Sequence, residues 1–472
     1  MPVPPPPVTS ALAELAATAR PGPADRDRAR LLLADYLAVA AAGAAADSAR
    51  VARSALLPGG NGEAGAAGAA GPAGTAAVLG TRHFAPVRDA ALLNGISAHS
   101  LELDDTHEPS SSHPGTVIWT ALLAASSARP APAAAVLDSA VAGYQVMASL
   151  GELLGPAELY GQGLHPTAVC GVFGAAAAVA RLRGLDPGGV AQSFGIALSM
   201  AAGSMAYLSE GAWTKRFHSG SAAAGGILAA DLAAGGFTGP ADAVGDRYGL
   251  MHIYGGARPS ARADAVTGHA AGLPAVHETS VKFHPCCRYM HGVMDLLAAY
   301  RSEGGRTEGL TGIDCGVLTG GMSLVGEPLA RKRQVTSTVD AQFSMPFGAA
   351  LALARGSSSV TDFARAGELA AELRPWLEIT RVHTSPALDA AYPQRWGAEV
   401  TLTFDGGEPV ELRTEAFRGS PGWPAGRQEL TEKAAGLIGE PAADRLLAAV
   451  DGLAAGARFD PSALAAASPV TA

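Results

Sequence analysis

The chain has 472 residues, more than one hydrophobic core usually serves, so we expect two domains. It is 48% hydrophobic and 16% charged with a net charge of −9, which excludes a basic surface for nucleic acid. Four cysteines are too few for a disulfide framework, and no charged segment precedes an apolar stretch at the start. We expect a cytoplasmic protein that spans no membrane.

The first part of the chain, from Ala11 to about Val266, has a helical pattern. Apolar residues recur at helical spacing in Arg28–Ala44, which predicts an amphipathic helix. Later segments are apolar almost all round, as in helices buried inside a large bundle. These segments are Val117–Ala128, Ala134–Leu153, Ala168–Arg183, Gly188–Ala202 and Ser221–Ala234.

The pattern changes near Leu273, where strand-like runs begin to alternate with helices. The predicted strands are Val276–Phe283, Gly312–Gly320, Glu378–Thr384 and a hairpin of Ala398–Phe404 with Val410–Glu415. The predicted helices between them are Tyr289–Arg301, Phe347–Ala354 and Thr361–Arg374, and two more follow at Glu429–Leu437 and Ala442–Gly452.

These elements predict a mainly α fold in two domains. A large all-helical domain takes residues 9–272 and, with the last helices, residues 416–456. An inserted α+β domain takes residues 273–415, a usual domain size, and residues 457–472 are expected to form a loose tail.

Three segments place a histidine before a proline and an apolar helix: His113-Pro114, His165-Pro166 and His284-Pro285. Proline suits the first helical turn and holds the preceding residue extended, so each histidine has a fixed position ahead of a helix. Helix N-termini offer free N–H groups and a positive dipole end. The pattern therefore predicts a site for carboxylates with imidazoles beside it.

Basic residues accompany these helix starts. Lys215-Arg216-Phe217-His218 directly precedes a predicted helix, and Lys282 and Arg288 flank the third histidine. Cations oppose the dipole at a helix N-terminus, and an anionic ligand between them would reverse that penalty. The alternative is that these side chains reach solvent or pair with Glu210 or Glu278.

An acidic cluster, Glu102–Glu108, follows His99 and holds four carboxylates. It could be an ordinary capped and solvated loop, since Asp and Ser favour such turns. It could also bind a divalent cation, although the spacings H-x-x-x-H and H-x-H are missing. We expect instead that the carboxylates orient and tune a histidine base, with no metal or cofactor.

Several stretches, in order along the chain, resemble the MmgE/PrpD family. They are Ala90–His107, His113–Gly115, Gly163–Thr167 with Gly171–Ala176, Gly211–His218, Lys282–Cys287 and Ala341–Pro346. The family includes 2-methylcitrate dehydratase, cis-aconitate decarboxylase and iminodisuccinate epimerase. The resemblance implies a helical domain formed by both chain ends, an inserted lid domain, a cofactor-free homodimer, and a site between bundle and lid.

Carried over by position, the resemblance places the active site on residues of this chain. The predicted catalytic residues are His113, His165, Lys215, Lys282 and Asp105. The predicted substrate-binding residues are Glu102, Thr106, Arg288, Cys287 and His291. Glu102 stands where the decarboxylases carry a shorter aspartate. Cys287 stands where they carry a histidine, for which His291 is a candidate replacement one turn further along.

The expected activity is that of a lyase dehydrating a small hydroxy-polycarboxylate, similar to 2-methylcitrate, or a carboxylated secondary-metabolite precursor. One histidine would remove the proton next to a carboxylate while the other protonates the departing hydroxyl, and the lysines would hold carboxylates. Decarboxylation of a cis-aconitate-like acid and epimerisation or isomerisation of a dicarboxylate begin in the same way. Two hypotheses of a different class are a carboxylate-binding protein without activity and a metal-dependent hydrolase or lyase.

Overall fold

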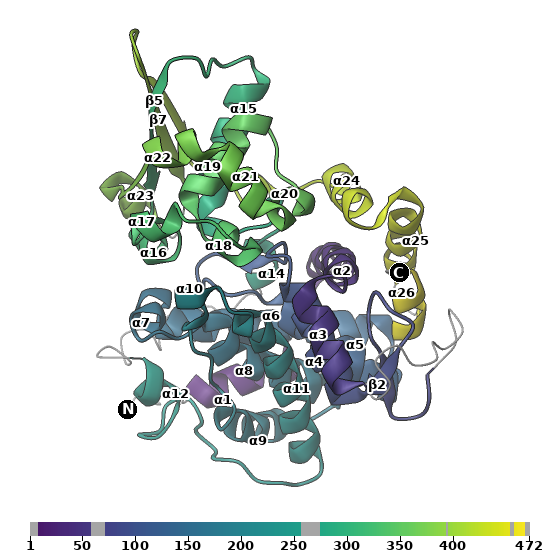
Figure 1. The fold of residues 1–472 in the computed structure, drawn as a ribbon. Coiled ribbons are helices and arrows are strands. Elements are labelled where there is room, and N and C mark those ends of the chain that lie inside the picture. The colour runs from purple at the N-terminus through teal and green to yellow at the C-terminus, as the bar shows by residue number, and fades with distance from the viewer. Residues whose placement is uncertain (1–7, 58–70, 256–273, 393–394, 454–456, 468–472) are drawn as a thin grey trace.

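The computed structural model describes residues 8–57, 71–255, 274–392, 395–453 and 457–467. Most of these residues are helical and few form strands, so the predicted mainly α fold is confirmed. Figure 1 shows a helical part, with both chain ends, and a second part that holds the main sheet. The predicted domain boundary at 272/273 lies outside the described residues, and the division of the chain into domains stays a prediction.

The helical part begins with long helices joined by short connections. Its elements up to residue 280 are α1 Val8–Thr18, α2 Pro23–Gly43, α3 Asp47–Leu56, β1 Thr75–Ala77, β2 Phe84–Pro86, α4 Val87–His99, β3 Thr106–His107, α5 Gly115–Ala128, α6 Ala133–Leu154, α7 Pro156–Gly161, α8 Pro166–Leu182, α9 Pro187–Leu198, α10 Tyr207–Glu210, α11 Thr214–Ala234, α12 Leu250–Tyr254, α14 Ala275–Glu278 and β4 Thr279–Ser280. The predicted helices are confirmed here, although α11 begins at Thr214 instead of Ser221 and α9 ends at Leu198 instead of Ala202. Lys215 and Arg216, which we expected to precede this helix, belong to its first turn, and both are buried.

Helices α4 and α11 approach each other closely through glycines. A Cβ added to Gly95 would lie 2.5 Å from the Gly220 nitrogen, and one added to Gly220 would lie 3.0 Å from the Leu92 carbonyl carbon. Side chains at these positions would force the two helices apart. The contact sets the start of α11, which carries Lys215, beside the end of α4, which leads to Glu102.

A continuous hydrophobic core fills the helical part. It includes residues of α5, α6 and α8 such as Trp119, Tyr144 and Phe173, all fully buried, and residues from the last helices such as Phe459. Helix α6 has 22 residues, and its most apolar 18-residue window has a mean hydropathy of 1.3, enough by length and composition to cross a membrane. In the most apolar window of this helix, 83% of the residues are buried inside the fold, as in the core helix of a bundle.

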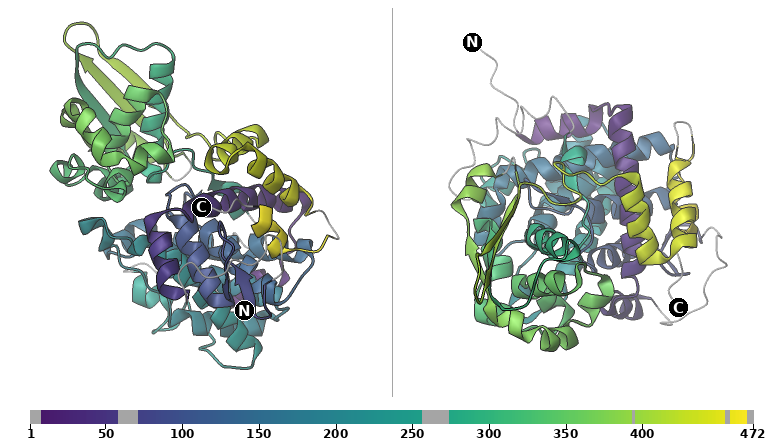
Figure 2. Two further views of the ribbon diagram at one scale, coloured as in Figure 1. Left: turned by 45° about the vertical axis from the view of Figure 1, so that its right-hand side comes forward. Right: turned by 90° about the horizontal axis from the view of Figure 1, so that it is seen from above.

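The second part has its own core and a four-stranded sheet (Figure 2). Strands β6 Thr380–Thr384, β5 Leu310–Val317, β7 Ala398–Phe404 and β8 Val410–Thr414 lie in that order, with β5 and β6 parallel and the other pairs antiparallel. Its helical elements are the 3₁₀ turn Arg288–Met290, α15 His291–Ser302, α16 Thr319–Gly321, the π turn Met322–Gly326, α17 Leu329–Lys332, α18 Thr338–Gln342, α19 Met345–Arg355, α20 Val360–Ala364, α21 Ala366–Glu372, α22 Arg374–Ile379 and α23 Pro386–Ala391. The predicted hairpin and the strands at 312 and 378 are confirmed.

Three expectations about this region are wrong. The segment 276–283 is not a strand, because helix α14 covers its beginning and only Thr279 and Ser280 pair, with β3. No helix starts at Pro285; residues 285–287 are non-helical and α15 begins at His291. The helix predicted at 361–374 is broken at Arg365, whose backbone leaves helical geometry (ψ 23°).

The expected loose tail is also wrong for residues 457–467. The Ala133 nitrogen donates to the Ala457 carbonyl at 2.8 Å, and the Phe459 nitrogen donates to the Ala131 carbonyl at 3.0 Å. Helix α26, Pro461–Ala467, buries Leu464 against the helical core. Apolar residues spaced along a short segment gave too weak a sequence signal for this docking. Residues 468–472 lie outside the described residues.

Helices α24 Arg427–Ile438 and α25 Glu440–Asp451 return to the helical part beside α2 (Figure 1). Lys433 of α24 forms an ion pair with Asp35 of α2 at 2.6 Å, with side chains only 5% and 2% exposed. The same ammonium donates to the Leu103 carbonyl at 3.0 Å. The return of the chain therefore braces the loop that holds the acidic cluster.

We predict that Lys433→Ala lowers the free energy of unfolding by about 3–5 kcal/mol, because Asp35 is left as a buried, unpaired charge. Urea denaturation measures the change. The control is Arg427→Ala on the same helix, which breaks the exposed pair with Asp451 and should cost under about 1 kcal/mol. Equal effects of the two substitutions would contradict the prediction.

Candidate active site

A small cavity lies where the helical part meets the α+β part. Its volume is about 30 Å³, room for one or two water molecules. It is lined by Glu102, Thr106, Ser111, His113, Tyr160, His165, Tyr207, Lys215, Cys287, Arg288, Tyr289, Leu324 and Phe343. Segments from residue 102 to residue 343 thus contribute to one site.

Most of the residues predicted from the sequence meet at this cavity. Those lining it are Glu102, Thr106, His113, His165, Lys215, Cys287 and Arg288. Lys282 lies directly behind Glu102, fully buried. Asp105 and His291 are outside the lining, with their side chains engaged elsewhere.

Two of the three histidine–proline units place imidazoles at neighbouring helix starts. His165 is the N-cap residue of α8, with Pro166 in the first turn. His113 precedes Pro114 at the start of α5, and its backbone nitrogen donates to Thr167 Oγ1 at 3.1 Å. The two ring centroids are 6.1 Å apart. The third unit differs, because His284 bonds to Ser358 and Asp295, away from the cavity.

A short pair of strands joins the acidic loop to the lysine segment. Thr106 pairs with Ser280 and His107 with Thr279, antiparallel. This pairing brings Lys282 under the acidic loop, where its ammonium donates to the Glu102 carbonyl oxygen at 3.0 Å and to the Cys286 carbonyl oxygen at 3.2 Å.

Two non-glycine residues of the described chain have a positive φ, and both line the cavity. Glu102 has φ 55° and Ser111 has φ 48°. This left-handed conformation costs a side-chain-bearing residue roughly 1–3 kcal/mol, and it persists only where the surroundings enforce it. Such strain at two cavity residues makes this cavity the candidate functional site.

Glu102 lies between the two lysines. It forms an ion pair with Lys215, and its other oxygen is 3.4 Å from the Lys282 ammonium. Burial opposes ionisation of this carboxyl, but the two ammonium groups hold its pKa below the ordinary value. Burial in turn lowers the pKa of Lys215. The three side chains together keep one net positive charge at the cavity wall.

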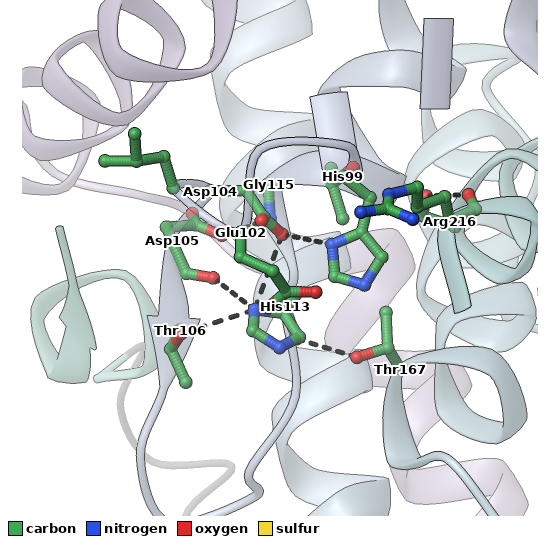
Figure 3. A network of polar contacts seen from close by, with 12 residues as sticks. His99, Glu102, Asp104, Asp105, Thr106, His113, Gly115, Thr167 and Arg216 are labelled. Atoms are coloured by element: carbon green, nitrogen blue, oxygen red, sulfur yellow. Dashed lines mark hydrogen bonds and ion pairs between the residues drawn. The ribbon is translucent and has the colours of Figure 1, made fainter. Parts of the chain in front are cut away.

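The carboxylate that pairs with the histidines is Asp104, not Asp105 (Figure 3). Asp104 Oδ2 lies 2.8 Å from His99 Nδ1 and 3.4 Å from His113 Nδ1. The Asp105 carboxyl instead accepts from the Gly115 nitrogen at 2.8 Å and from the Tyr144 hydroxyl at 2.7 Å. The expected orienting role of Asp105 therefore falls to its backbone, whose carbonyl lies 2.8 Å from His113 Nδ1.

This carbonyl fixes the tautomer of His113. A carbonyl oxygen only accepts, so Nδ1 carries the proton and Nε2 of the neutral ring keeps its lone pair. Burial, opposed by Asp104 and reinforced by Lys215, lowers the pKa of His113 well below 6.5. Burial and Lys215 do the same to the pKa of His165, whose Nδ1 lies 3.2 Å from His218 Nδ1. Both imidazoles are therefore neutral near pH 7.

Comparison with known families identifies the family of this chain. Residues 10–262 match the MmgE/PrpD N-terminal domain, and residues 284–451 match the MmgE/PrpD C-terminal domain. The chain belongs to the MmgE/PrpD family. The sequence stretches that carry the resemblance therefore mark a true family relationship.

Several curated relatives are named for one activity. The chain is 32% identical over 227 residues to the cis-aconitate decarboxylase-like protein oryM of Aspergillus oryzae, covering 46% of this chain and 47% of that protein. It is 30% identical over 222 residues to cis-aconitate decarboxylase of Homo sapiens, covering 46% and 45%. The similarity to the Mus musculus enzyme is 25% over 356 residues, covering 74% and 71%. For the first two, the matched region spans about half of each relative.

Three further residues that the sequence singled out, Cys287, Arg288 and His291, have different surroundings. The Cys287 thiol lines the cavity, and burial raises its pKa. His291 does not replace a cavity histidine, because it bonds to Arg288 and faces the Cys286 carbonyl. Arg288 lies in a 3₁₀ turn before α15, not in the first turn of a helix, and pairs with Glu108 at 2.8 Å.

A group of aromatic residues around the cavity was not predicted from the sequence: Tyr160, Tyr207, Tyr289 and Phe343. Burial raises the pKa values of Tyr160, Tyr207 and Tyr289 above the ordinary value of a tyrosine, so their hydroxyls remain protonated donors. Phe343 lies within the family stretch 341–346 and packs 5.3 Å from the Lys215 ammonium. That stretch was the one available signal, since the tyrosines stand outside every family stretch.

We predict that the protein loses stability as the pH falls from 7.5 to 5.5. Burial lowers the pKa of five histidines, namely His99, His113, His165, His218 and His291, so the unfolded chain binds protons that the folded chain does not. Their stabilisation is present above about pH 6.5, the pKa of unfolded histidine, and is lost below it. Burial raises the pKa of Asp35 and Asp105, the latter to about 7, and these two oppose the trend but are outnumbered.

Thermal denaturation at the two pH values measures this loss. His165→Asn removes one of the depressed groups and should make the fall in Tm shallower, whereas Asp105→Asn removes an opposing group and should make it steeper. A wild-type Tm that stays level or rises on acidification would contradict the assignment.

Proposed function

We propose that this protein is a lyase that dehydrates a small hydroxy-polycarboxylate. The observation that supports the proposal is a pair of neutral imidazoles, His113 and His165, 6.1 Å apart at one cavity with Lys215 beside them. Dehydration needs one group that takes a proton from carbon and another that gives a proton to the hydroxyl. Two imidazoles that line one small cavity meet that need.

In this mechanism His113 is the base. Its Nε2 lone pair takes the proton from the carbon next to a carboxylate. The Asp105 carbonyl oxygen and the Asp104 carboxylate keep the other ring proton on Nδ1. His165 gives its N–H proton to the hydroxyl as the proton taken up by His113 reaches its other nitrogen through water, so that neither ring becomes an anion. The C–O bond breaks, water leaves as the carbon–carbon double bond forms, and both rings end neutral.

The positive charge at the wall stabilises the anionic intermediate. Removing a proton next to a carboxylate puts negative charge on its oxygens, and preorganised cations and donors supply most of the stabilisation in such sites. Lys215 lines the cavity and Lys282 supports Glu102 from behind. The Tyr207 and Tyr160 hydroxyls stand beside them as neutral donors.

The α+β part would act as a lid. Ligand pockets commonly measure about 300–1,000 Å³, and this cavity of about 30 Å³ is far smaller. Cys287, Arg288 and Phe343 line it from the α+β part, and the histidines and Lys215 line it from the helical part. Movement of one part away from the other would admit the substrate, and closure would exclude water. A cytoplasmic homodimer working without a cofactor completes the proposal.

Decarboxylation of a cis-aconitate-like acid is the second candidate. It is supported by the names of the relatives, cis-aconitate decarboxylase in two mammals and a decarboxylase-like protein in a fungus. There the C–C bond to a carboxylate breaks, CO₂ leaves, and an imidazole gives its proton to the carbon. Glu102 and Cys287, which differ from the decarboxylases, favour dehydration as the first choice.

We predict that His165→Ala lowers kcat by roughly 10²–10⁴-fold, the usual contribution of a general acid or base, with little change in Tm at pH 7.5. The matched control is His277→Ala, which removes a half-exposed histidine paired with Asp25 at the surface and should retain turnover. Wild-type turnover in the His165 variant would refute the assignment.

The reaction itself is decided by NMR in D₂O with 2-methylcitrate, citrate and cis-aconitate. An alkene product that has lost water supports dehydration. A product that has lost CO₂ and carries deuterium on carbon supports decarboxylation instead. Binding of these acids without turnover or exchange at carbon would show a carboxylate-binding protein. Loss of activity after EDTA treatment would show a metal-dependent enzyme.

A further inference from the structure

Three buried imidazoles form a cluster at the inner end of the site. The rings of His99 and His113 are 4.8 Å apart, and His99 lies 5.9 Å from His165. Each residue offers a ring nitrogen within 4.8 Å of those of the other two. Of these three histidines, His113 and His165 line the cavity and His99 does not. The proposed acid–base chemistry therefore makes no use of His99.

The outer nitrogen of each ring is held by a partner. His99 Nδ1 bonds to the Asp104 carboxylate at 2.8 Å, and His113 Nδ1 bonds to the Asp105 carbonyl at 2.8 Å. His165 Nδ1 lies 3.2 Å from His218 Nδ1. For His99 and His113, the carboxylate and the carbonyl that accept from Nδ1 fix the tautomer with a free Nε2 lone pair, as they do behind histidines that bind metals.

One of these lone pairs has no partner. His99 Nε2 is fully buried and, in the described part of the chain, forms no hydrogen bond. A buried polar atom without a partner costs roughly 1–3 kcal/mol, so its persistence calls for a ligand. Figure 3 shows its Nδ1 tied to Asp104 while the other nitrogen of the ring stays free.

We propose that His99, His113 and His165 bind a transition-metal ion of the Zn²⁺ type through their Nε2 atoms. Three neutral imidazoles with an open fourth position suit Zn²⁺, and they suit Cu²⁺ and Ni²⁺ as well. Local charge does not exclude a cation, because the Asp104 carboxylate, which lies at His99 and His113, offsets the one net positive charge of Glu102 with Lys215 and Lys282.

The consequence is inhibition. An ion on the three nitrogens takes the lone pair that His113 needs as a base and the position from which His165 gives its proton. The ion therefore blocks turnover reversibly, without being a cofactor. This part rests on the proposed function, whereas the binding itself does not.

Calorimetric titration of the full chain with ZnCl₂, without substrate, tests the binding. We expect one Zn²⁺ per chain, and binding weakened 10–100-fold in Asp104→Asn, which loses the carboxylate behind His99. The control is Asp25→Asn, the same change at the surface pair with His277, which should bind Zn²⁺ as the wild type does. No binding by the wild type, or equal effects of both variants, would overturn the proposal.

A second test is X-ray absorption at the zinc edge of the wild-type protein with Zn²⁺ bound. Because it uses no variant, misfolding of a variant cannot affect the result. Three imidazole ligands at about 2.0–2.1 Å are expected, and fewer than three, or a sulfur ligand from Cys287, would overturn the site. Turnover is then assayed with and without Zn²⁺ and after EDTA. Binding without any turnover would refute the proposed function alone, while turnover unaffected by bound Zn²⁺ would refute the inhibition.

Discussion

The ion group of Glu102 with Lys215 and Lys282 is the constraint on which the site depends. Two lysines this deeply buried would lose their charge or destabilise the fold unless a carboxylate accompanied them. Glu102 reaches both because its backbone turns through a strained conformation, with φ 55°. The pair of short strands and the brace from Lys433 hold the surrounding loop, so tertiary contacts maintain this strain.

Around this group the structure divides the acidic cluster into separate tasks. Glu102 balances the lysines, Asp104 holds His99 and His113, and Asp105 caps α5 and bonds to Tyr144. Asp105 can bond to the start of α5 only because residue 115 is a glycine, since a Cβ there would lie 2.6 Å from the Asp105 carboxylate. The pKa values of these neighbouring carboxylates therefore shift in opposite directions. The histidines lower the pKa of Asp104, and burial raises the pKa of Asp105.

Histidine tautomers connect the proposed function to the metal inference. The same hydrogen bonds to Nδ1 that prepare His113 as a base also prepare it as a metal ligand, because both uses need the lone pair on Nε2. Anions and cations would contact different groups in this site. An anionic substrate meets Lys215 and the tyrosine hydroxyls, whereas a cation meets the nitrogens and the carboxylates behind them.

The sequence by itself determined the mainly α fold, the family, and most of the charged and imidazole residues that line the cavity. These follow from local signals, namely helical periodicity, proline after histidine, and motifs in a fixed order. It also located β7 and β8, whose alternation and turn residues are local. It did not determine that α11 begins seven residues early, that no helix starts at Pro285, or that Phe459 docks on the core.

Only the tertiary structure decided which carboxylate faces which histidine, and that tyrosines complete the cavity wall. Asp104 and Asp105 are adjacent and chemically alike, so no local pattern distinguishes them. Their roles depend on the position of α5, Tyr144 and His99, brought together by helices that touch at glycines. A periodic pattern records how each helix is buried, but the identity of a side chain's partner depends on contacts between residues far apart in the chain.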